Sequence, residues 1–404
     1  MKERILKILF AMLEVPELTV REQKEMIDSF PEPKDDYDRV FYNYRCSKKG
    51  QKLITTVAFN LIGIAACPFL LLLYSINRIV MVFKEKKEFC DAVIIEHTNR
   101  VGVKYSIEGR VPQQIFEEFD NVKTLKTGTF PKISKGVIGT TPLKTWVIFV
   151  AKHPLKGFLN LRVLINLMGI QRIIDIYEPK AIVISRAEWN GISSLTTYSC
   201  ERQGVEYINL MHGEMLAENS SAFVRFSRFF IWDEDYIDVL GWSRCERSQF
   251  VVFTPEIYTR DETPNKPPRY FLLYALTGNE KTGKDENVEL LKQELKLITE
   301  TGRKCKVRPH PRWSDVKYLE EVFKETSIVL EDINTKTATE SILESNYVAS
   351  NYSTILSEAY YLGKKIVIDD VTNPALIEVL KERKYLMLKK EHILLSELKE
   401  ACYN

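Results

Sequence analysis

The chain has 404 residues, more than one hydrophobic core usually holds, so we expect two domains and an additional segment. Hydrophobic residues make up 45% of the chain and charged residues 28%, a balance that excludes a disordered protein. The 57 Lys and Arg residues against 55 Asp and Glu residues leave a net charge of only +2, which excludes a broad basic surface, and we expect no nucleic-acid partner.

Residues 1–88 are expected to form an N-terminal helical region. Basic residues precede a short apolar run in residues 1–16, but no small-residue cleavage site follows, so we expect no secretory signal. Thr19 and Glu22 have the spacing of a capping box, which predicts the start of a helix. The seven cysteines are scattered without a C-x-x-C pair and without zinc-ligand spacing, which indicates free thiols in a reducing compartment.

The hydrophobic segment at residues 53–83 predicts membrane association. Residues 53–77 contain no charged residue and are long enough to cross a bilayer. Both flanks are rich in Lys and Arg, which favours re-entry over crossing because basic flanks stay on the cytoplasmic side. A helix break at Cys67–Pro68 would permit a shallow hairpin. A buried core helix is the alternative, and the sequence leaves spanning and re-entry open. We expect a location on the cytoplasmic face of the cell membrane.

Residues 89–255 alternate between strand-like and helix-like segments and predict one Rossmann-like domain, on which we expect the acceptor to bind. The expected strands are residues 92–95, 181–185, 205–211, 229–232 and 250–253. The expected helices are residues 161–177 and 193–203.

Residues 256–404 predict a second Rossmann-like domain, which would bind the nucleotide donor. A proline-rich linker is expected at residues 258–268. The expected strands are residues 270–274, 305–308, 328–330, 347–350 and 365–369, and the expected helices are residues 285–301, 316–324, 339–344 and 355–362. The predicted fold class is α/β, with two Rossmann-like domains facing a cleft.

Ligands of open parallel sheets bind beyond the carboxyl ends of the strands, so polar residues at those ends are the site candidates. His310 stands between two prolines directly after a predicted strand, which fixes the direction of its imidazole and suits donation to a phosphate. Arg308 and Arg312 add positive charge, although one of them could serve only packing. The alternative for His310 and Pro311 is purely structural, with His310 capping the next helix and Pro311 ending the strand.

A second candidate phosphate loop follows the strand that ends at Ser350. Ser353 and Thr354 stand at the start of a helix, where hydroxyls, free backbone N–H groups and the helix dipole favour an anion. Helix capping alone would also explain Ser353. The Thr277–Gly278 loop ends another predicted strand, and we assign it to the same nucleotide-binding site.

The N-terminal domain offers two candidate bases. Glu188, with Asn190 close behind it, follows the strand at residues 181–185, and His212 follows the strand at residues 205–211. A glycine after His212 allows the backbone to turn sharply and present the imidazole. We place Asn190 and Glu214 on the acceptor side. Each candidate base could instead have no role in catalysis. His212 could be a structural residue, and Glu188 could be a surface acid.

Acidic residues at positions 233, 234, 235 and 238 could suggest a divalent metal. A solvated turn after the aromatic strand explains them better, because Asp233-x-Asp235 is a weak motif. We therefore expect no metal site, and no cofactor apart from the nucleotide-activated donor, which is a substrate.

The Arg308-x-His310-Pro311 loop and the later Ser350-x-x-Ser353-Thr354-Ile-Leu-x-Glu358-Ala pattern resemble inverting GT-B glycosyltransferases of bacterial surface polysaccharide synthesis. The match covers about residues 205–370. It is similar to the bacterial sialyltransferases and polysialyltransferases, and to the CDP-glycerol glycerophosphotransferases.

The resemblance implies a CMP- or CDP-linked donor, two facing Rossmann-like domains and no metal at the phosphates. It further implies that His310, Ser353 and Thr354 contact the donor phosphate. His212 is similar to the His-Gly motif of the glycerophosphotransferases, whose His is a proposed base. Glu188 matches only loosely the acidic pair that the sialyltransferases use.

We therefore expect a membrane-associated inverting glycosyltransferase of surface polysaccharide or glycolipid synthesis, with products such as capsule or lipopolysaccharide. Its expected partners are a nucleotide-sugar donor, a glycan or lipid-linked acceptor and the membrane surface. A polyol-phosphate transferase, or a non-catalytic nucleotide-binding component of an assembly complex, is the alternative.

Overall fold

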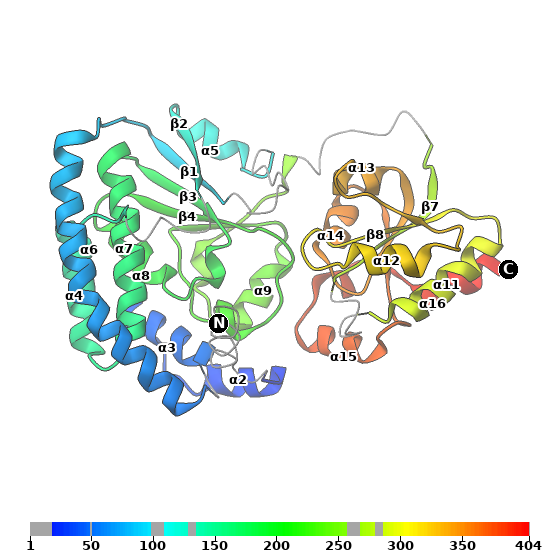
Figure 1. The fold of residues 1–404 in the computed structure, drawn as a ribbon, viewed down its shortest axis with the longest axis horizontal. Helices are drawn as coiled ribbons and strands as arrows, with labels where there is room; N and C mark the ends of the chain where they lie inside the picture. The colour runs from blue at the N-terminus through cyan, green and yellow to red at the C-terminus, as the bar shows by residue number, and fades with distance from the viewer. Residues whose placement is uncertain are drawn as a thin grey trace. The chain divides into compact units, whose positions relative to one another are not determined.

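The computed structural model describes residues 18–48, 51–97, 109–127, 135–256, 267–278 and 286–403. The chain divides into two compact units (Figure 1). The N-terminal unit contains the described residues up to His212 together with Glu218–Phe253. The C-terminal unit contains Gly213–Ala217 and the described residues from Thr254 onward. Residues 1–16, for which no secretory signal is expected, lie outside the described residues. Most of the predicted linker at residues 258–268 also lies outside them.

The N-terminal unit is built on a six-stranded parallel sheet with the order β2-β1-β3-β4-β5-β6. Its strands are β1 (Ala92–His97), β2 (Val122–Thr127), β3 (Ala181–Ser185), β4 (Glu206–Leu210), β5 (Arg228–Ile231) and β6 (Phe250–Val252). Strands such as β3 are apolar on both faces because helices bury both faces of a parallel sheet. The strand order reverses between β1 and β3, and such a switch point is where doubly wound sheets bind ligands.

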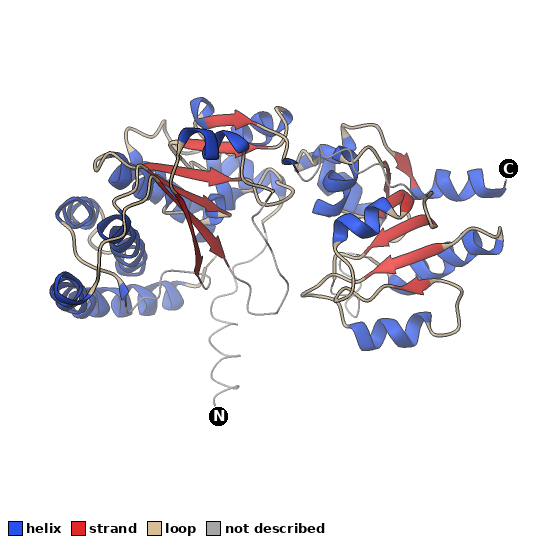
Figure 2. Ribbon diagram, turned by 90° about the horizontal axis from the view of Figure 1, so that it is seen from above, coloured by secondary structure: helices blue, strands red, loops and turns tan. Residues whose placement is uncertain are grey.

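The helices of this unit connect the strands and pack on the sheet (Figure 2). They are α5 (Gln113–Glu118), α6 (Thr140–Lys152), α7 (Gly157–Tyr177), α8 (Ser193–Glu201) and α9 (Asp235–Trp242), with short 3-10 turns η2 (Ala187–Trp189), η3 (Asn219–Ser221) and η4 (Arg247–Gln249). Helix α7 begins four residues before its predicted start and ends where Glu178 adopts a left-handed conformation with φ of 43°. The prediction missed β2, α5, α6 and α9.

Three helices precede β1: α2 (Val20–Asp28), α3 (Asp36–Lys48) and α4 (Leu53–Lys84). The capping box of α2 is confirmed, because Glu22 N donates to Thr19 Oγ1 at 3.2 Å and Thr19 N donates to Glu22 Oε2 at 2.9 Å. Helix α4 continues through Pro68 for 32 residues, so the predicted break and the hairpin built on it are wrong. Packing on both sides of Pro68, through Gly63 and Leu70, outweighs the single hydrogen bond that proline removes.

Helices α4 and α7 are the two described helices whose length and composition would allow them to cross a membrane. They differ in exposure, since 67% of the apolar window of α7 is buried in the protein but only 22% of that of α4. Helix α7 is therefore a core helix, and α4 is a surface helix.

The C-terminal unit has its own six-stranded parallel sheet, in the order β12-β11-β10-β7-β8-β9. Its strands are β7 (Tyr270–Ala275), β8 (Cys305–Arg308), β9 (Val329–Leu330), β10 (Ser345–Ser350), β11 (Lys365–Ile368) and β12 (Ile393–Leu394). Counted along the chain this is the Rossmann order 3-2-1-4-5-6, with the switch point between β7 and β10. The prediction of two Rossmann-like domains is confirmed.

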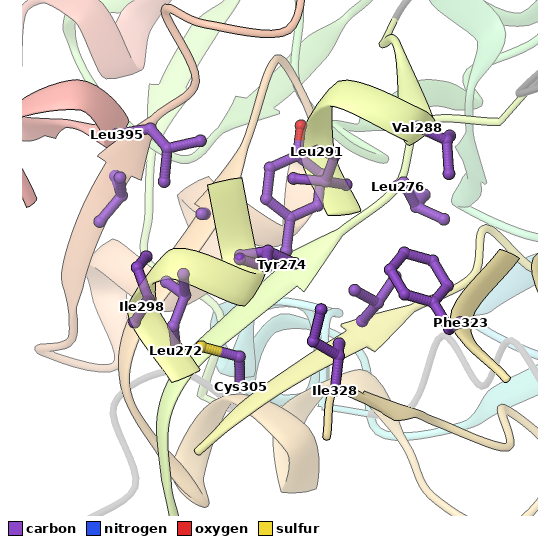
Figure 3. Packing of buried hydrophobic residues seen from close by; sticks show 14 of the residues in the cluster. Leu272, Tyr274, Leu276, Val288, Leu291, Ile298, Cys305, Phe323, Ile328 and Leu395 are labelled. Atoms are coloured by element: carbon purple, nitrogen blue, oxygen red, sulfur yellow. The ribbon is translucent and has the colours of Figure 1, made fainter. Parts of the chain in front are cut away.

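The helices of the C-terminal unit are α11 (Val288–Glu300), α12 (Val316–Phe323), α13 (Ala338–Leu343), α14 (Thr354–Tyr361), α15 (Pro374–Glu382) and α16 (Leu395–Tyr403), with a 3-10 turn η5 (Leu386–Leu388). Leu291, Leu295 and Ile298 of α11 pack on Leu272 and Tyr274 of β7 in a continuous core (Figure 3). The prediction missed α15, α16 and β12. All seven cysteines are buried free thiols.

Candidate functional site

Three loops of the C-terminal unit leave neighbouring strands at the same edge of the sheet. Strand β7 lies between β8 and β10, and Ala275 pairs with Arg308 while Tyr274 pairs with Ala349. Carboxyl ends of parallel strands lie at one edge, so the loops that contain Thr277, His310 and Ser353 are adjacent. The loops after β7 and β10 flank the switch point. The fold thus brings together residues that the sequence spreads over more than seventy positions.

His310 is held as a neutral donor. Its Nδ1 accepts the backbone N–H groups of Arg312 at 3.1 Å and Trp313 at 3.2 Å, so the imidazole proton resides on Nε2. Burial, with a smaller contribution from the charge of Arg312, lowers the pKa of His310 to about 4. The ring is only partly buried. A neutral imidazole whose Nε2–H is fixed in direction is suited to donate to a phosphate oxygen at neutral pH.

Gly278 permits the close approach of the β7 and β8 loops. It has a φ of +105°, and a Cβ at this position would lie 2.3 Å from Cβ of Trp313. Trp313 itself is 60% exposed. Sequence reasoning missed Trp313, although an exposed aromatic ring next to a phosphate loop is a platform on which a base or sugar could stack. The signal available in the sequence was its position three residues after His310.

Thr277 is fixed by a carboxylate that sequence reasoning overlooked. Glu286 is 1% exposed and accepts the Thr277 backbone N–H at 2.6 Å as well as the Thr277 hydroxyl. Both donors of Thr277 are therefore engaged within the protein. Glu286 therefore holds the loop at the end of β7 in place. Thr277 defines the conformation of this loop, and its hydrogen-bond donors are used by Glu286.

Ser353 and Thr354 begin helix α14. Ser353 is the N-cap, and its Oγ accepts Ile355 N at 3.4 Å, a long bond that constrains the hydroxyl weakly. Both residues are partly exposed. Thr354 Oγ1 accepts the backbone N–H of Glu214 at 3.1 Å. The dipole of an eight-residue helix adds to these hydroxyls, so the start of α14 is a second candidate site for an anion in this unit.

Other predicted donor-site residues have structural partners. The Arg308 guanidinium pairs with Glu331 Oε2 at 2.6 Å and donates to Lys336 O at 3.0 Å. Ser350 is fully buried, and its Oγ donates to Ala275 O at 2.8 Å, which ties β10 to β7. These contacts give Arg308 and Ser350 structural roles within the C-terminal unit. Direct roles in donor binding stay predictions for both.

The remaining predicted donor-site residues occupy different environments. Glu358 is 6% exposed within α14. Arg312 is exposed beside His310, and Pro311 is partly exposed. Of these three, only Arg312 carries a positive charge, and its side chain is exposed.

Glu188 lies in η2, just after β3, with its side chain completely buried. Asn209 of β4 donates from Nδ2 to Glu188 Oε2 at 2.8 Å, while Glu188 Oε1 is buried without a hydrogen bond to any described residue. Burial raises the pKa of Glu188 to about 7, against the opposing bond from Asn209. The predicted alternative of a surface acid is wrong. A carboxyl this deeply buried cannot touch an acceptor hydroxyl without rearrangement.

His212 follows the neighbouring strand, because β4 pairs with β3 and Leu210 lies opposite Ser185. Its side chain is partly exposed, and its backbone oxygen accepts from Arg110 at 3.4 Å. The two candidate bases therefore lie at one edge of the N-terminal sheet, and of the two His212 is the accessible one. Asn190, also partly exposed, contacts Asn166 of α7 at 3.5 Å.

Glu214 lies within the C-terminal unit, although the sequence order predicts a place on the acceptor side. It is 9% exposed and accepts the hydroxyl of Ser357 in α14. Ala217 N donates to Arg383 O at 2.8 Å in the same unit. The segment 213–217 is thus anchored to the helix that Ser353 caps. These contacts place Glu214 beside the start of α14, and its predicted place on the acceptor side stays a prediction.

Within the described residues, no three His, Cys, Asp or Glu side chains lie close enough to hold a metal ion. The predicted solvated turn is wrong for Asp235 and Asp238, which lie in the first turn of α9, and Asp233 Oδ1 accepts Asp235 N at 3.0 Å just before this helix.

No protein-family model and no curated protein matches the sequence. Solved structures similar to this chain include UDP-GlcNAc 2-epimerase from Neisseria meningitidis bound to UDP-GlcNAc, at 10% identity over 71% of this chain and 85% of that chain, with a TM-score of 0.44. The wall teichoic acid polymerase TagF is similar at 10% identity over 81% and 83%, with a TM-score of 0.45. Acinetobacter baumannii MurG is similar at 9% identity over 78% and 91%, with a TM-score of 0.40. Likenesses this distant say nothing about which residues act or which group is transferred.

Proposed function

We propose that this chain is an inverting, metal-independent GT-B-type glycosyltransferase that uses a CMP- or CDP-linked donor in surface polysaccharide or glycolipid synthesis, at the cytoplasmic face of the cell membrane. The observation that carries the proposal is the set of loops after β7, β8 and β10. They combine a neutral His310 with the N-terminus of α14 at the switch point of a Rossmann sheet.

The donor phosphates bind to this set of loops. His310 donates from Nε2, and the hydroxyls of Ser353 and Thr354 at the start of α14 supply further donors. Trp313 offers its exposed face to the base or the sugar. These groups are fixed before the reaction, so they stabilise the charge that develops on the departing nucleotide phosphate without reorganisation.

The acceptor hydroxyl loses its proton to His212. The hydroxyl oxygen forms a bond to the donor carbon as the bond from that carbon to the nucleotide phosphate breaks, and the electron pair leaves with the phosphate. We assign the base to His212 over Glu188 because the imidazole is partly exposed and the Glu188 carboxyl is completely buried. Glu188 shapes the end of β3 through Asn209.

A second candidate is transfer of a polyol phosphate from a CDP-linked donor. It is favoured by one observation, the accessible His212 followed directly by Gly213, which is similar to the motif of the glycerophosphotransferases. In that reaction the acceptor oxygen attacks phosphorus, and the released nucleotide is CMP rather than CDP.

Donor turnover tests the proposal. Purified full-length protein is incubated with CMP-, CDP-, UDP- and GDP-linked donors, with and without a membrane lipid extract, and the released nucleotide is identified by chromatography. Release of CMP from a CMP-sugar or of CDP from a CDP-sugar supports sugar transfer, and release of CMP from CDP-glycerol supports the second candidate. Nucleotide binding without release from any donor would make the chain a binding component.

His212→Ala tests the assignment of the base. Turnover should fall by roughly a hundred- to ten-thousand-fold, the usual contribution of a positioned base, while donor affinity stays nearly unchanged. Glu188→Gln is the matched comparison and should retain most of the turnover. The opposite pattern would make the carboxylate the base and would favour the sialyltransferase-like mechanism.

A further inference from the structure

Helix α4 presents a wide outward surface in which exposed apolar side chains predominate. Thirteen large apolar residues of this helix are each at least 44% exposed. They are Leu53, Ile54, Val57, Leu61, Ile62, Ile64, Phe69, Leu72, Ile76, Ile79, Val80, Val82 and Phe83, and together we call them the outward face of α4. The single charged residue between positions 53 and 83 is Arg78, which pairs with Asp175 of α7. An uncharged exposed surface of this extent marks an interaction site.

The opposite side of α4 is fixed along α7 (Figure 1). Near the start of α4 the two backbones are in contact, because a Cβ on Gly63 would lie 2.2 Å from the carbonyl carbon of Gly157. Near its end, Asn77 Nδ2 donates to Gly136 O at 2.8 Å, and Arg78 pairs with Asp175. Contacts at both ends hold α4 lengthwise against the unit.

This attachment is incompatible with a membrane crossing. Helix α7 leads directly into β3 in the middle of the sheet, and it buries polar side chains such as Asn166 and Gln171. A spanning α4 would draw α7 and the sheet into hydrocarbon, where their polar groups are costly. With 32 residues, α4 is about 48 Å long at the usual rise per residue, which exceeds the ~30 Å hydrocarbon core.

Basic side chains lie at both ends of α4. Lys48, Lys52 and Arg162 lie near its start, and Lys84 and Lys86 at its end; none forms an ion pair with a described residue. Burial lowers the pKa of Lys48 and of Arg162, and the Arg162 charge lowers that of Lys48 further. A nearby anion would offset that cost. The ends of α4 thus complement negatively charged headgroups.

We infer that the outward face of α4 docks lengthwise into the headgroup–acyl boundary of an anionic bilayer, so that the N-terminal unit is held on the membrane surface without crossing it. This deepens the proposed function, since it rests on the proposed membrane location, but it is independent of the reaction. The apolar side chains enter the boundary between headgroups and chains, and the basic ends contact anionic lipid.

Vesicle flotation tests the docking. Full-length protein is mixed with phosphatidylcholine vesicles with or without phosphatidylglycerol, and the floating fraction is measured without any donor. Leu61→Glu and Phe69→Glu should abolish flotation, whereas Val379→Glu, at an exposed apolar position of α15, should leave it unchanged. Lys84→Gln and Lys86→Gln should each lower vesicle affinity by about fivefold at low salt. Equal flotation of the α4 variants and the wild type would overturn the inference.

Labelling distinguishes lying on the membrane from spanning it. Lys52→Cys and Lys86→Cys place single accessible thiols at the two ends of α4, against native cysteines that are all buried. In intact cells an impermeant maleimide should label neither position, and after permeabilisation it should label both. Labelling of one end in intact cells would mean a crossing.

Two further measurements distinguish membrane docking from self-association and from a defect in donor binding. Sedimentation of lipid-free protein that shows a dimer abolished by Phe69→Glu would make the outward face of α4 an interface between copies of this chain and would overturn the docking. Nucleotide titration of the same variants should match the wild type, so a failure of docking remains distinguishable from a failure of the proposed reaction.

Discussion

Glu188→Gln removes an ionisable side chain that is completely buried at the end of β3. Its carboxyl has a pKa of about 7 in the folded protein, compared with 4.5 for a free glutamate. An acid whose pKa is raised by folding adds stability below its unfolded pKa, and that stability is lost as the pH rises through the folded pKa. The wild type therefore loses stability between pH 4.5 and 7, because burial disfavours ionisation of Glu188 in the folded protein more than the bond from Asn209 favours it.

The size of this effect follows from the two pKa values. A difference of about 2.5 pH units corresponds to about 3 kcal/mol once the group is ionised in both states, and no allowance for solvent exposure is needed because the side chain is fully buried. The substituted glutamine would keep the acceptor for Asn209 Nδ2 but would not ionise. From pH 5 to pH 8 the variant should gain about 2 to 3 kcal/mol of unfolding free energy relative to the wild type.

Urea unfolding of both proteins across this pH range measures the difference. The control is Glu117→Gln, which removes an exposed carboxylate of α5 and should leave the pH dependence unchanged. Parallel stability curves for Glu188→Gln and the wild type would refute the reasoning, because they would mean that folding does not raise the pKa of this carboxyl. A constant offset added to the pH-dependent difference would report the cost of the buried amide.

Three further changes test the donor loops. His310→Ala should weaken nucleotide binding by roughly ten- to a hundredfold, the value of a hydrogen bond to a charged group, as measured by calorimetric titration; unchanged affinity would remove His310 from the site. Ser353→Ala should reduce nucleotide affinity and destabilise the C-terminal unit by at most about 1 kcal/mol, since its capping bond is long, and thermal unfolding checks the second part. Gly278→Ala forces a Cβ against Trp313 at positive φ and should cost about 1 to 3 kcal/mol in urea unfolding, with weaker nucleotide binding; wild-type stability would mean that the loop adapts freely.

Much of the fold could be predicted because its signals are local. Short β-branched runs indicate strands such as β3 and β11, and Thr19 with Glu22 indicates the start of α2. Elements without such signals were missed. Edge strand β2 contains two lysines, Lys123 and Lys126, and has no β-branched run, and α5 is only six residues long. The break at Pro68 was predicted from a local rule that packing against α7 overrides.

The contacts within the candidate site could not be predicted from local sequence signals. His310 and Ser353 could be proposed because each follows a strand, but their neighbourhood depends on the placement of β7 between β8 and β10. Arg308 could be interpreted as a phosphate ligand because Glu331, its ion-pair partner, is 23 positions away. Glu214 could be placed on the acceptor side because its partner Ser357 is 143 positions away. Contacts between residues this far apart in the chain cannot be predicted from local sequence patterns.

The order of amino acids is enough to establish the alternation of strands and helices, the apolar character of residues 53–83, and the polar residues at strand ends, because each depends on neighbours along the chain. Which strands are adjacent, and hence where both switch points lie, follows only from the folded chain. So do the burial of Glu188, which keeps its carboxyl largely uncharged below neutral pH, and the position of α4 along α7. Burial and pairing depend on chain segments that are distant in sequence, and these set the chemistry of the site.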